Sequence, residues 1–237
     1  MNDGLVPKIK TRGYWRINFR PTSPTDAIDS VMEAKRLVEQ CTVGLRGWDF
    51  PHMPGAGLSD DRTALLANCF QASTEWGDKH EFWSIYTSTQ FIHLKSIRTD
   101  WLEEDTFHGD RAANYPPNVL GLVDNIWHVT EAFEFLSRLT GAGLYRHGVT
   151  VSVGLMNTLG RTLHVDDSKR AGLNWDRKTS ATNIIYSKLL SAKEINEPKT
   201  RTKEAVHYIL DRFGFQPEEP ILDGAIDELY GLNIGRG

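Results

Sequence analysis

The sequence contains few cysteines and no long hydrophobic run. Two of its 237 residues are cysteine, Cys41 and Cys69, and apolar, strand-like sequence follows each of them. Such cysteines are typical of small buried side chains in a reducing compartment, so we expect no structural disulfide. A membrane-spanning helix needs about 18 or more consecutive apolar residues, whereas charged side chains interrupt the most hydrophobic segment, 119–139. We therefore expect no membrane partner.

Export signals and an excess of basic charge are missing as well. Residues 1–10 hold neither the apolar stretch nor the small-residue cleavage site of a secretory signal, which predicts a cytoplasmic protein. The formal net charge is −4 and the isoelectric point is near 6.1. A free-standing nucleic-acid binder usually carries many lysines and arginines, so contact with nucleic acid would need a local basic face.

Several named catalytic motifs do not occur. The sequence lacks Gly-x-x-x-x-Gly-Lys, Gly-x-Ser-x-Gly, His-Glu-x-x-His, Cys-x-x-Cys and Gly-x-Gly-x-x-Gly. These absences disfavour P-loop ATPases, serine hydrolases, zinc proteases and Rossmann dehydrogenases. They do not exclude a nuclease, because the carboxylates and the lysine of a nuclease can be scattered along the chain.

What the chain does contain predicts one folded domain. With 40% hydrophobic residues and seven Trp it can bury a core, and its length is within the range of a single domain. Strands and helices are mixed along the sequence, which favours an α+β fold with a mixed or mainly antiparallel sheet and helices packed on one face. We expect residues 11–165 to form the sheet-and-helix core of a domain that spans 1–237, and residues 181–237 to form a helical C-terminal extension.

Periodicity and turn residues place the elements of the first half. Alternation from Tyr14 to Arg20 predicts a strand, and Ser23 with the following Pro24 predicts the start of a helix. The expected elements that follow are strands at 42–50 and 65–76, a short helix at 79–89, a strand at 91–97 and an exposed loop at 101–117.

The second half is expected to begin with the longest helix. It starts after a cap at Asn118 and ends at Gly141 and Gly143. Alternating apolar residues at 149–155 predict a strand that forms a hairpin with 161–165. Helical spacing at 206–213 predicts a terminal helix.

The densest group of functional side chains is Arg46, Trp48, Asp49 and His52, at the end of an expected strand. A guanidinium, a carboxylate and an imidazole this close together can bind an anion or handle a proton, and an indole can stack on a planar ligand. The simpler interpretation places Trp48 in the core, pairs Arg46 with Asp49 and leaves His52 in solvent. The sequence favours that simpler interpretation.

Three further groups have weaker signals. Glu75, Asp78, His80 and Glu81 could surround a divalent metal, although a helix N-cap explains Asp78 equally well. On the long helix, His128, Glu131 and Glu134 could serve acid-base chemistry, but a solvated helix face is the favoured interpretation. His93 and Lys95 share one face of the 91–97 strand, where an edge lysine is more ordinary than a catalytic one.

A possible nucleic-acid surface lies on the first strand. Arg12, Arg16 and Arg20 share one face of it, with Lys8 and Lys10 nearby. The same arginines could instead protect an edge strand from aggregation. With Trp83 added as a second aromatic side chain, the candidate binding residues are Arg16, Arg20, Arg46, Trp48, Asp49, His52 and Trp83. We assign no catalytic residue, no metal ligand and no cofactor.

Several segments resemble a bacterial family that has no established activity and whose members are described as hypothetical or as DNA-binding. The resemblance covers most of the chain, and its segments are Gly13-Tyr14-Trp15-Arg16, the run from Leu45 to His52, Glu81-Phe82-Trp83, Gln90-Phe91-Ile92-His93-Leu94, the run from Thr130 to Phe135, and Arg212-Phe213-Gly214-Phe215. Such proteins are found near defence and mobile-element genes, so the resemblance implies a role in defence.

Two functions therefore remain open at the level of the sequence. The first is a non-catalytic recognition or assembly subunit of a bacterial intracellular complex, which binds another protein subunit or a second copy of itself and contacts nucleic acid. The alternative is a metal-dependent nuclease or related phosphoester hydrolase built on Asp49, Glu75 and Asp78. The alternative requires these carboxylates to converge in space.

Overall fold

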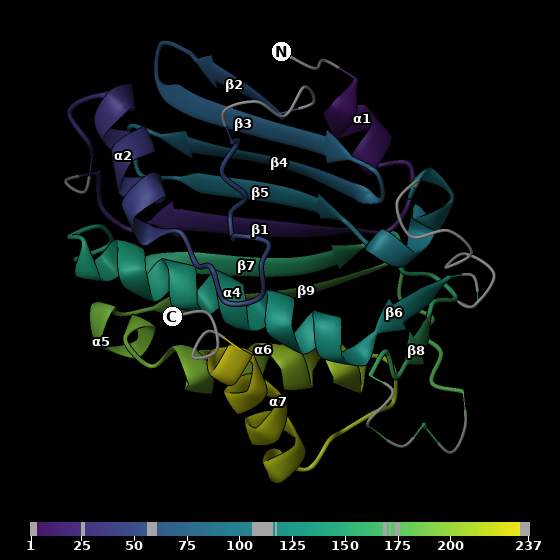
Figure 1. Ribbon diagram of the computed structural model, residues 1–237. Helices are drawn as coiled ribbons and strands as arrows, with labels where there is room; N and C mark the ends of the chain where they lie inside the picture. The colour runs from purple at the N-terminus through teal and green to yellow at the C-terminus, as the bar shows by residue number, and fades with distance from the viewer. Residues whose placement is uncertain are drawn as a thin grey trace.

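A seven-stranded antiparallel sheet forms the centre of the computed structural model, with strand order β2-β3-β4-β5-β1-β7-β9 (Figure 1). The structure describes residues 4–24, 27–55, 61–105, 116, 118–167, 170, 172–173 and 176–232. The strands are β1 (Tyr14–Pro21), β2 (Asp61–Leu65), β3 (Cys69–Trp76), β4 (Lys79–Tyr86), β5 (Phe91–Ser96), β7 (Val149–Met156) and β9 (Asn183–Leu190). The predicted α+β class with a mainly antiparallel sheet is confirmed.

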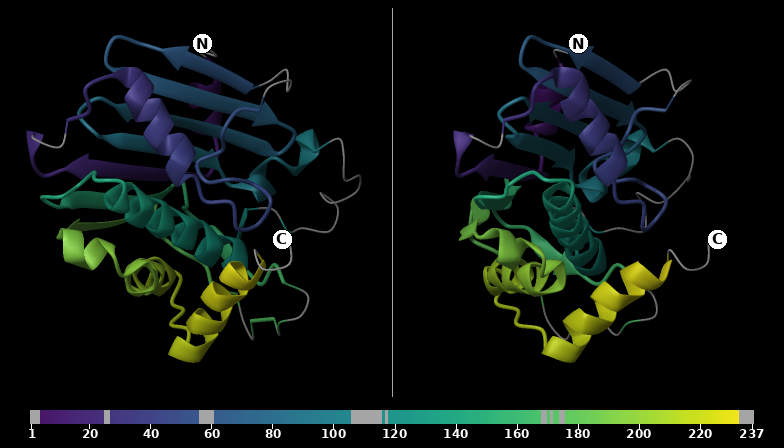
Figure 2. Two further views of the ribbon diagram at one scale, coloured as in Figure 1. Left: turned by 60° about the vertical axis from the view of Figure 1, so that its left-hand side comes forward. Right: turned by 90° about the vertical axis from the view of Figure 1, so that its left-hand side faces the viewer.

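Helices cover one face of the sheet and pack at its β9 end (Figure 2). The main helices are α2 (Val31–Cys41), α4 (Leu122–Gly141), α6 (Pro198–Asp211) and α7 (Glu219–Leu232), with the short α1 (Leu5–Ile9) and α5 (Ala192–Ile195). α2 and α4 lie on one face, α6 and α7 pack on α4, and α1 contacts β4 and β5 from the opposite face. The helices are therefore not confined to one face, because α1 has its own small apolar contact.

The alternation of β1 explains how the core forms. Trp15, Ile17 and Phe19 are buried beneath α4, and the intervening Arg16 and Arg20 point to the other face. Each fully buried apolar side chain contributes about 1.5–3 kcal/mol. Cys41 and Cys69 are buried and free, as their sequence context predicts. No helix in the described part of the chain combines the length and the hydropathy that a membrane span requires.

The predicted helix at 79–89 is wrong: Lys79–Tyr86 is strand β4, and residues 87–89 form the turn that follows it. Trp76 pairs with Lys79 across a tight turn in which Gly77 has φ +55°, so β3 and β4 form a hairpin. Glu81, Trp83 and Ile85 then alternate toward the helical layer, which is the two-residue period of a strand. Asp78 lies in this turn and is no helix cap.

Segment 42–50 is not a strand either. It forms one isolated bridge, Val43 to Phe50, and turns at Gly47, whose φ of +83° favours glycine. The preceding helix is present but begins later than predicted: Ser30 caps α2 by accepting a bond from the Glu33 backbone N–H at 3.1 Å. Ser23 and Pro24 lie before that cap.

The hairpin expected near residue 160 has a different partner. β7 pairs with β1 and β9, whereas β8 (Thr162–His164) pairs in parallel with the short β6 (Val119–Gly121). Asn118 therefore precedes a strand and does not cap a helix. Segment 181–237 supplies β9 to the main sheet before it becomes helical. Most of the expected loop at 101–117 lies outside the described residues, but Leu102–Glu104 forms a short 3₁₀ turn, η3.

Candidate functional site

Basic side chains converge on a cavity of about 160 Å³ between the sheet and the N-terminal half of α4. We call it the cation pocket. Its lining consists of Arg46, Gly47, Trp48, Lys79, Lys95, Arg98 and Asp124. Four of these side chains are cations and one is a carboxylate, so the wall itself is strongly positive although the whole chain is acidic.

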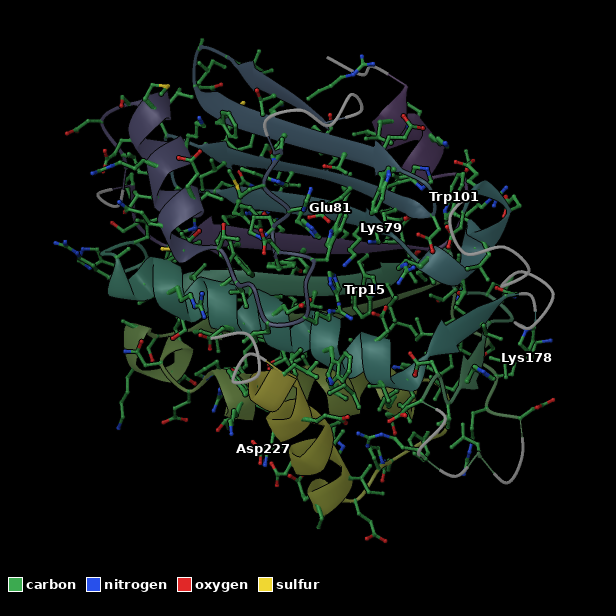
Figure 3. The ribbon with its side chains drawn as sticks, in the orientation of Figure 1. Trp15, Lys79, Glu81, Trp101, Lys178 and Asp227 are labelled. Atoms are coloured by element: carbon green, nitrogen blue, oxygen red, sulfur yellow. The ribbon has the colours of Figure 1, made fainter. Side chains whose placement is uncertain are left out.

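The register of the sheet positions these side chains. Lys95 of β5 lies opposite Glu81 of β4 and Trp15 of β1, and Lys79 is two residues before Glu81 on the same strand. Since side chains alternate along a strand, all four point toward the α4 side. Figure 3 shows Lys79, Glu81 and Trp15 directed into the same region in front of the sheet.

Arg46 is held between the loop and α4 by two carboxylates. Its Nε and Nη2 donate to Glu131 at 2.8 and 2.9 Å, and its Nη1 donates to Asp124. Burial disfavours the charged form of Arg46 and by itself would lower its pKa. Glu131 and Asp124 have the larger effect, so the pKa of the guanidinium is raised. Burial also opposes the charge of Asp124, yet Arg46 and Lys95 lower the pKa of that carboxyl to about 2.

Glu81 joins the loop to the sheet beneath the pocket. It accepts bonds from His93 Nε2 at 2.9 Å, from the His52 backbone N–H at 2.8 Å and from Trp48 Nε1 at 3.0 Å. Burial alone would raise its pKa, but His93 and Lys95, with these bonds, lower it to about 2. Glu81 is therefore a fixed anion that positions Trp48 and His52.

Lys79 and Lys95 differ from the arginines because neither forms an ion pair or hydrogen bond with any described residue. Lys79 Nζ lies 4.0 Å from the ring centre of Trp48 and 4.7 Å from that of Trp76, where it makes cation–π contacts. Burial, followed by the charges of Arg98 and Lys95, lowers the pKa of Lys79 to about 8. The pocket thus holds two lysines that make no direct ion pair with a carboxylate of the described residues.

The face of α4 that carries His128 and Glu131 is buried, which corrects the predicted solvated face. Both residues are 1% exposed, and Glu134 bonds Arg138 and Tyr230. His128 packs 5.0 Å from Trp15, and within the described ranges neither of its ring nitrogens has a hydrogen-bond partner. Burial, with nearby Lys95, lowers the pKa of His128 well below its usual value, so its imidazole is neutral.

The loop residues predicted from the sequence do come together. Arg46 and Trp48 line the cation pocket, and His52 stacks on Trp48 with ring centres 3.9 Å apart. Asp49 does not pair with Arg46, whose bonds go to α4. A side-chain carbon added at Gly44 would lie 3.1 Å from Asp49 Oδ1, so this carboxylate packs against its own loop.

The remaining predicted residues lie elsewhere. Arg16 and Arg20 are exposed on the opposite face of β1, which is a central strand between β5 and β7 and not an edge. Trp83 is 1% exposed and donates to the His52 backbone carbonyl at 2.8 Å, so it belongs to the core. Lys95 is also on a central strand, because β5 lies between β4 and β1.

Possible metal ligands gather on the opposite side of the sheet. In the described part of the chain, the group of three with ligand geometry is Glu75, His80 and Glu104. Lys8 of α1 reaches into it, with Nζ 2.7 Å from Glu75 and 2.8 Å from Glu104. Asp49 and Asp78 are not members of this group, and Asp78 bonds Arg98 at 2.7 Å. The convergence that the nuclease alternative requires is not found among these residues.

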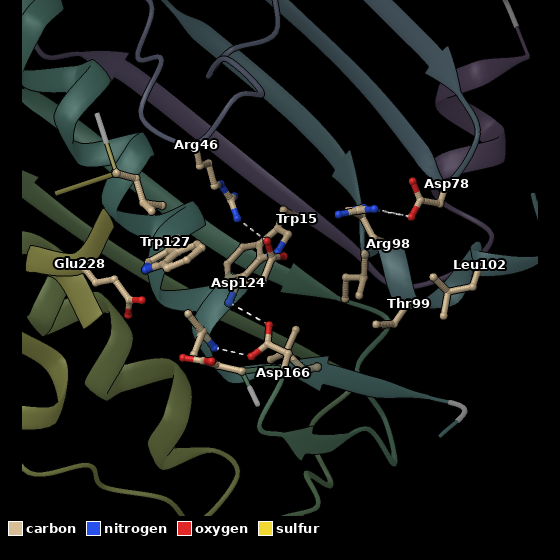
Figure 4. A pocket seen from close by; sticks show the side chains of 16 residues that line it. Trp15, Arg46, Asp78, Arg98, Thr99, Leu102, Asp124, Trp127, Asp166 and Glu228 are labelled. Atoms are coloured by element: carbon tan, nitrogen blue, oxygen red, sulfur yellow. Dashed lines mark hydrogen bonds and ion pairs between the residues drawn. The ribbon is translucent and has the colours of Figure 1, made fainter. Parts of the chain in front are cut away.

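A larger cavity of about 660 Å³ adjoins the cation pocket and shares Arg46, Arg98 and Asp124 with it (Figure 4). At its lower end Asp166 accepts bonds from the backbone N–H groups of Val123 at 2.8 Å and Asp124 at 3.0 Å. Gly121 allows this approach, because a side-chain carbon there would lie 2.3 Å from Asp166 Oδ2.

Lys79, Arg98 and Asp124 are not among the binding residues predicted from the sequence, and for Lys95 an edge lysine was favoured over a catalytic one. A strand assignment for 79–86 would have placed Lys79 and Glu81 on one face, opposite Lys95. The sequence contains that alternation, but Asp78 before it is also typical of a helix N-cap.

Comparisons of the chain with family models, with curated proteins and with solved structures gave no significant match. What can indicate a function is therefore the geometry and charge of the described residues.

Proposed function

We propose that this protein is a recognition subunit that binds a phosphate group of a nucleic acid or nucleotide in the cation pocket. The observation that carries the proposal is the convergence of Lys79 and Lys95 on one cavity, where neither lysine forms an ion pair or hydrogen bond with a described residue. Arg46 and Arg98 complete the ring of donors. Lysine and arginine donors of this kind form charge-assisted bonds with phosphate oxygens.

The surroundings of the pocket favour a phosphate that is attached to a base. Trp48 lines the pocket, is held by Glu81 and His52, and lies parallel to Trp76 at 5.9 Å between ring centres. His52 covers one face of Trp48, and Lys79 and Trp76 cover the other, so the indole proposed to stack on a base is Trp127 in the adjoining cavity. Stacking on an aromatic side chain stabilises nucleic-acid complexes by about 1–3 kcal/mol per base. The resemblance to bacterial proteins described as DNA-binding agrees with this ligand, and a role in defence is part of the same proposal.

Recognition is favoured over catalysis by the state of the acidic groups. Asp78 and Asp124 are each paired with an arginine, and Glu81 and Glu131 are buried in hydrogen bonds. A metal-dependent nuclease needs carboxylates that are available to bind an ion. We therefore expect the purified protein to bind oligonucleotides without cutting them in the presence of Mg²⁺ or Mn²⁺.

The test is binding of a 5′-phosphorylated single-stranded oligonucleotide, measured by fluorescence anisotropy at about 50 and about 200 mM salt. We expect Lys95→Gln to weaken binding about tenfold or more, because a charged hydrogen bond is worth about 1.5–3 kcal/mol. Arg20→Gln is the matched control, since it removes one cation from the opposite face.

If Arg20→Gln loses binding while Lys95→Gln binds normally, the cation pocket is not the phosphate site. The phosphate would then contact the open face of the sheet. Binding that is absent, or unchanged between the two salt concentrations, would refute phosphate recognition as a whole. Circular dichroism of both variants checks that each one is folded.

The assembly part of the proposal is supported by the open face of the sheet. On the adjacent strands β1, β7 and β9, Arg16 lies opposite Gly154, which in turn lies opposite Ile185. In the same way, Arg20 lies opposite Thr150, which lies opposite Leu189. Ile185 and Leu189 are 44% and 64% exposed. Exposed apolar side chains beside arginines are typical of a subunit contact, and the partner we propose is a second copy of this chain. Light scattering after size exclusion should give a dimer mass that Leu189→Asp reduces to that of a monomer.

A further inference from the structure

The larger cavity is positioned to hold whatever is attached to a phosphate in the cation pocket. The two spaces share Arg46, Arg98 and Asp124, so they form neighbouring compartments of one cleft (Figure 4). The larger compartment, about 660 Å³, is within the range of small-molecule sites, about 300–1,000 Å³. A bare phosphate ion would leave it unfilled.

The middle of this compartment is apolar and aromatic. Its wall includes Trp15, Trp127, Ile97, Leu120 and Val123. Trp127 is fixed by a bond from its Nε1 to the Ala225 carbonyl at 2.8 Å, so the indole is held in place before any ligand binds. A rigid aromatic wall next to a phosphate site favours a flat, partly apolar group such as a nucleobase.

The far end of the compartment is acidic. Asp166, Asp167 and Glu228 line it, and the structure assigns partners to each of them: the start of α4 for Asp166, and Arg170 for the other two. A carboxylate has more acceptor positions than the bonds of Asp166 and Glu228 use, so these two can still accept a bond from a hydroxyl or amino group. A second phosphate at this end would be repelled by the same charges.

We propose that the cleft binds one nucleoside monophosphate unit, with the phosphate in the cation pocket and the nucleoside in the larger compartment. This inference rests on the proposed function, because it takes the phosphate site as given. The ligand must combine a dianion, a flat ring and hydroxyl or amino donors, in the order in which the cleft presents cations, indoles and carboxylates. A free nucleotide and the 5′-terminal nucleotide of a strand share this chemistry.

Isothermal titration calorimetry with a set of defined probes tests the inference. The probes are inorganic phosphate, ribose 5-phosphate, adenosine, AMP and a 5′-phosphorylated dinucleotide. We expect AMP to bind about tenfold or more tighter than ribose 5-phosphate, the difference that about 1.4 kcal/mol from the buried base would produce. Binding of the dinucleotide as tight as that of AMP assigns the site to a strand end, and markedly weaker binding assigns it to a free nucleotide.

A variant that fills the larger compartment without changing charge separates the two proposals. Val123→Phe should abolish the advantage of AMP over ribose 5-phosphate and leave the binding of inorganic phosphate unchanged. Val6→Phe makes the same change in α1, on the opposite side of the sheet, and should alter neither. If Val123→Phe unfolds the protein, Leu232→Trp provides a second test, because Leu232 lines the same compartment and is 40% exposed.

The outcomes distinguish failure of this inference from failure of the proposed function. If phosphate-bearing probes bind but AMP is no tighter than ribose 5-phosphate, or if both filling variants leave the AMP advantage intact, the nucleoside site is wrong and the phosphate site stands. If no phosphate-bearing probe binds, both proposals fail.

Discussion

Two clusters of charged side chains lie on opposite faces of the same sheet. They differ in whether their lysines form ion pairs with carboxylates. Lys8 is held by Glu75 and Glu104 at 2.7 and 2.8 Å, which ties α1 to the β3–β4 hairpin. Lys79 and Lys95 lie in the cation pocket with no such partner among the described residues. The lysine of the first cluster is therefore fully paired with carboxylates, whereas the lysines of the second can still donate hydrogen bonds to a ligand.

The pKa values of these lysines express the same difference. Burial lowers the pKa of Lys8, but bonds to Glu104 and Glu75 outweigh it and the pKa is raised. Burial also lowers the pKa of Lys79, and the neighbouring Arg98 and Lys95 reinforce the effect, so its pKa is about 8. A lysine whose charged form is disfavoured costs stability, which is a feature of functional sites.

The largest effect is expected where the cation pocket meets the core. Arg46→Ala would leave Glu131 buried and unpaired, a change that typically costs about 3–5 kcal/mol. Unfolding by urea should show this loss. Arg36→Ala serves as the control, because Arg36 is an exposed residue of α2 that pairs only with Glu33 among the described residues, and its removal should cost less than about 0.5 kcal/mol. Equal losses in the two variants would contradict the central position of Arg46.

Lys79→Met sharpens the contrast between the two lysine sites. We expect about tenfold weaker phosphate binding together with a higher melting temperature, because the variant removes a desolvated positive charge while keeping the apolar stem. Thermal unfolding and anisotropy on the same sample measure both. A lower melting temperature would show that Lys79 stabilises the fold through its tryptophan contacts.

The titration of Lys79 predicts two pH effects with defined signs. Its folded-state pKa of about 8 is below the usual 10.5, so in that window the unfolded chain binds more protons. The wild type should therefore gain stability relative to Lys79→Met as the pH rises from about 8 to 10.5. Phosphate affinity should fall as the pH rises through about 8, because the lysine loses its charge. Parallel pH profiles for wild type and variant would argue against both effects.

The smallest effect is expected on the opposite face. Lys8→Met breaks two partly exposed ion pairs, and such pairs are worth about 0.2–1 kcal/mol each. Denaturant unfolding should show a loss of this size while oligonucleotide binding stays normal. Weakened binding in this variant would indicate that the two clusters are coupled through the sheet.

Much of the framework follows from local pattern. The alternation at 14–20 and the helical spacing after residue 119 are strong because they extend over many residues, and both elements are present as β1 and α4. The helix predicted for segment 79–89 is wrong because Asp78 resembles a helix N-cap, although the residue lies in the turn between β3 and β4. The strand 161–165 was given the wrong partner because sequence proximity was taken for pairing.

The candidate site was predictable only in part. Arg46, Trp48 and His52 were found because they are neighbours in the sequence, and a local cluster remains local after folding. Lys79, Lys95 and Asp124 come from three elements, and their meeting depends on the register of β4 with β5 and on the position of α4. The spacing of residues along one sequence does not specify how two strands are aligned with each other.

The sequence by itself determined the class of fold, the first strand, the long helix and the local grouping of Arg46, Trp48 and His52, since each depends on residues close together along the chain. Tertiary structure alone decided which charges are paired. Packing of α4 against the sheet and the loop of Arg46 and Phe50 buried a face that its sequence would place in water, and the antiparallel sheet brought two lysines to one cavity. Burial and electrostatic pairing depend on distances in space, and a linear pattern does not specify those distances.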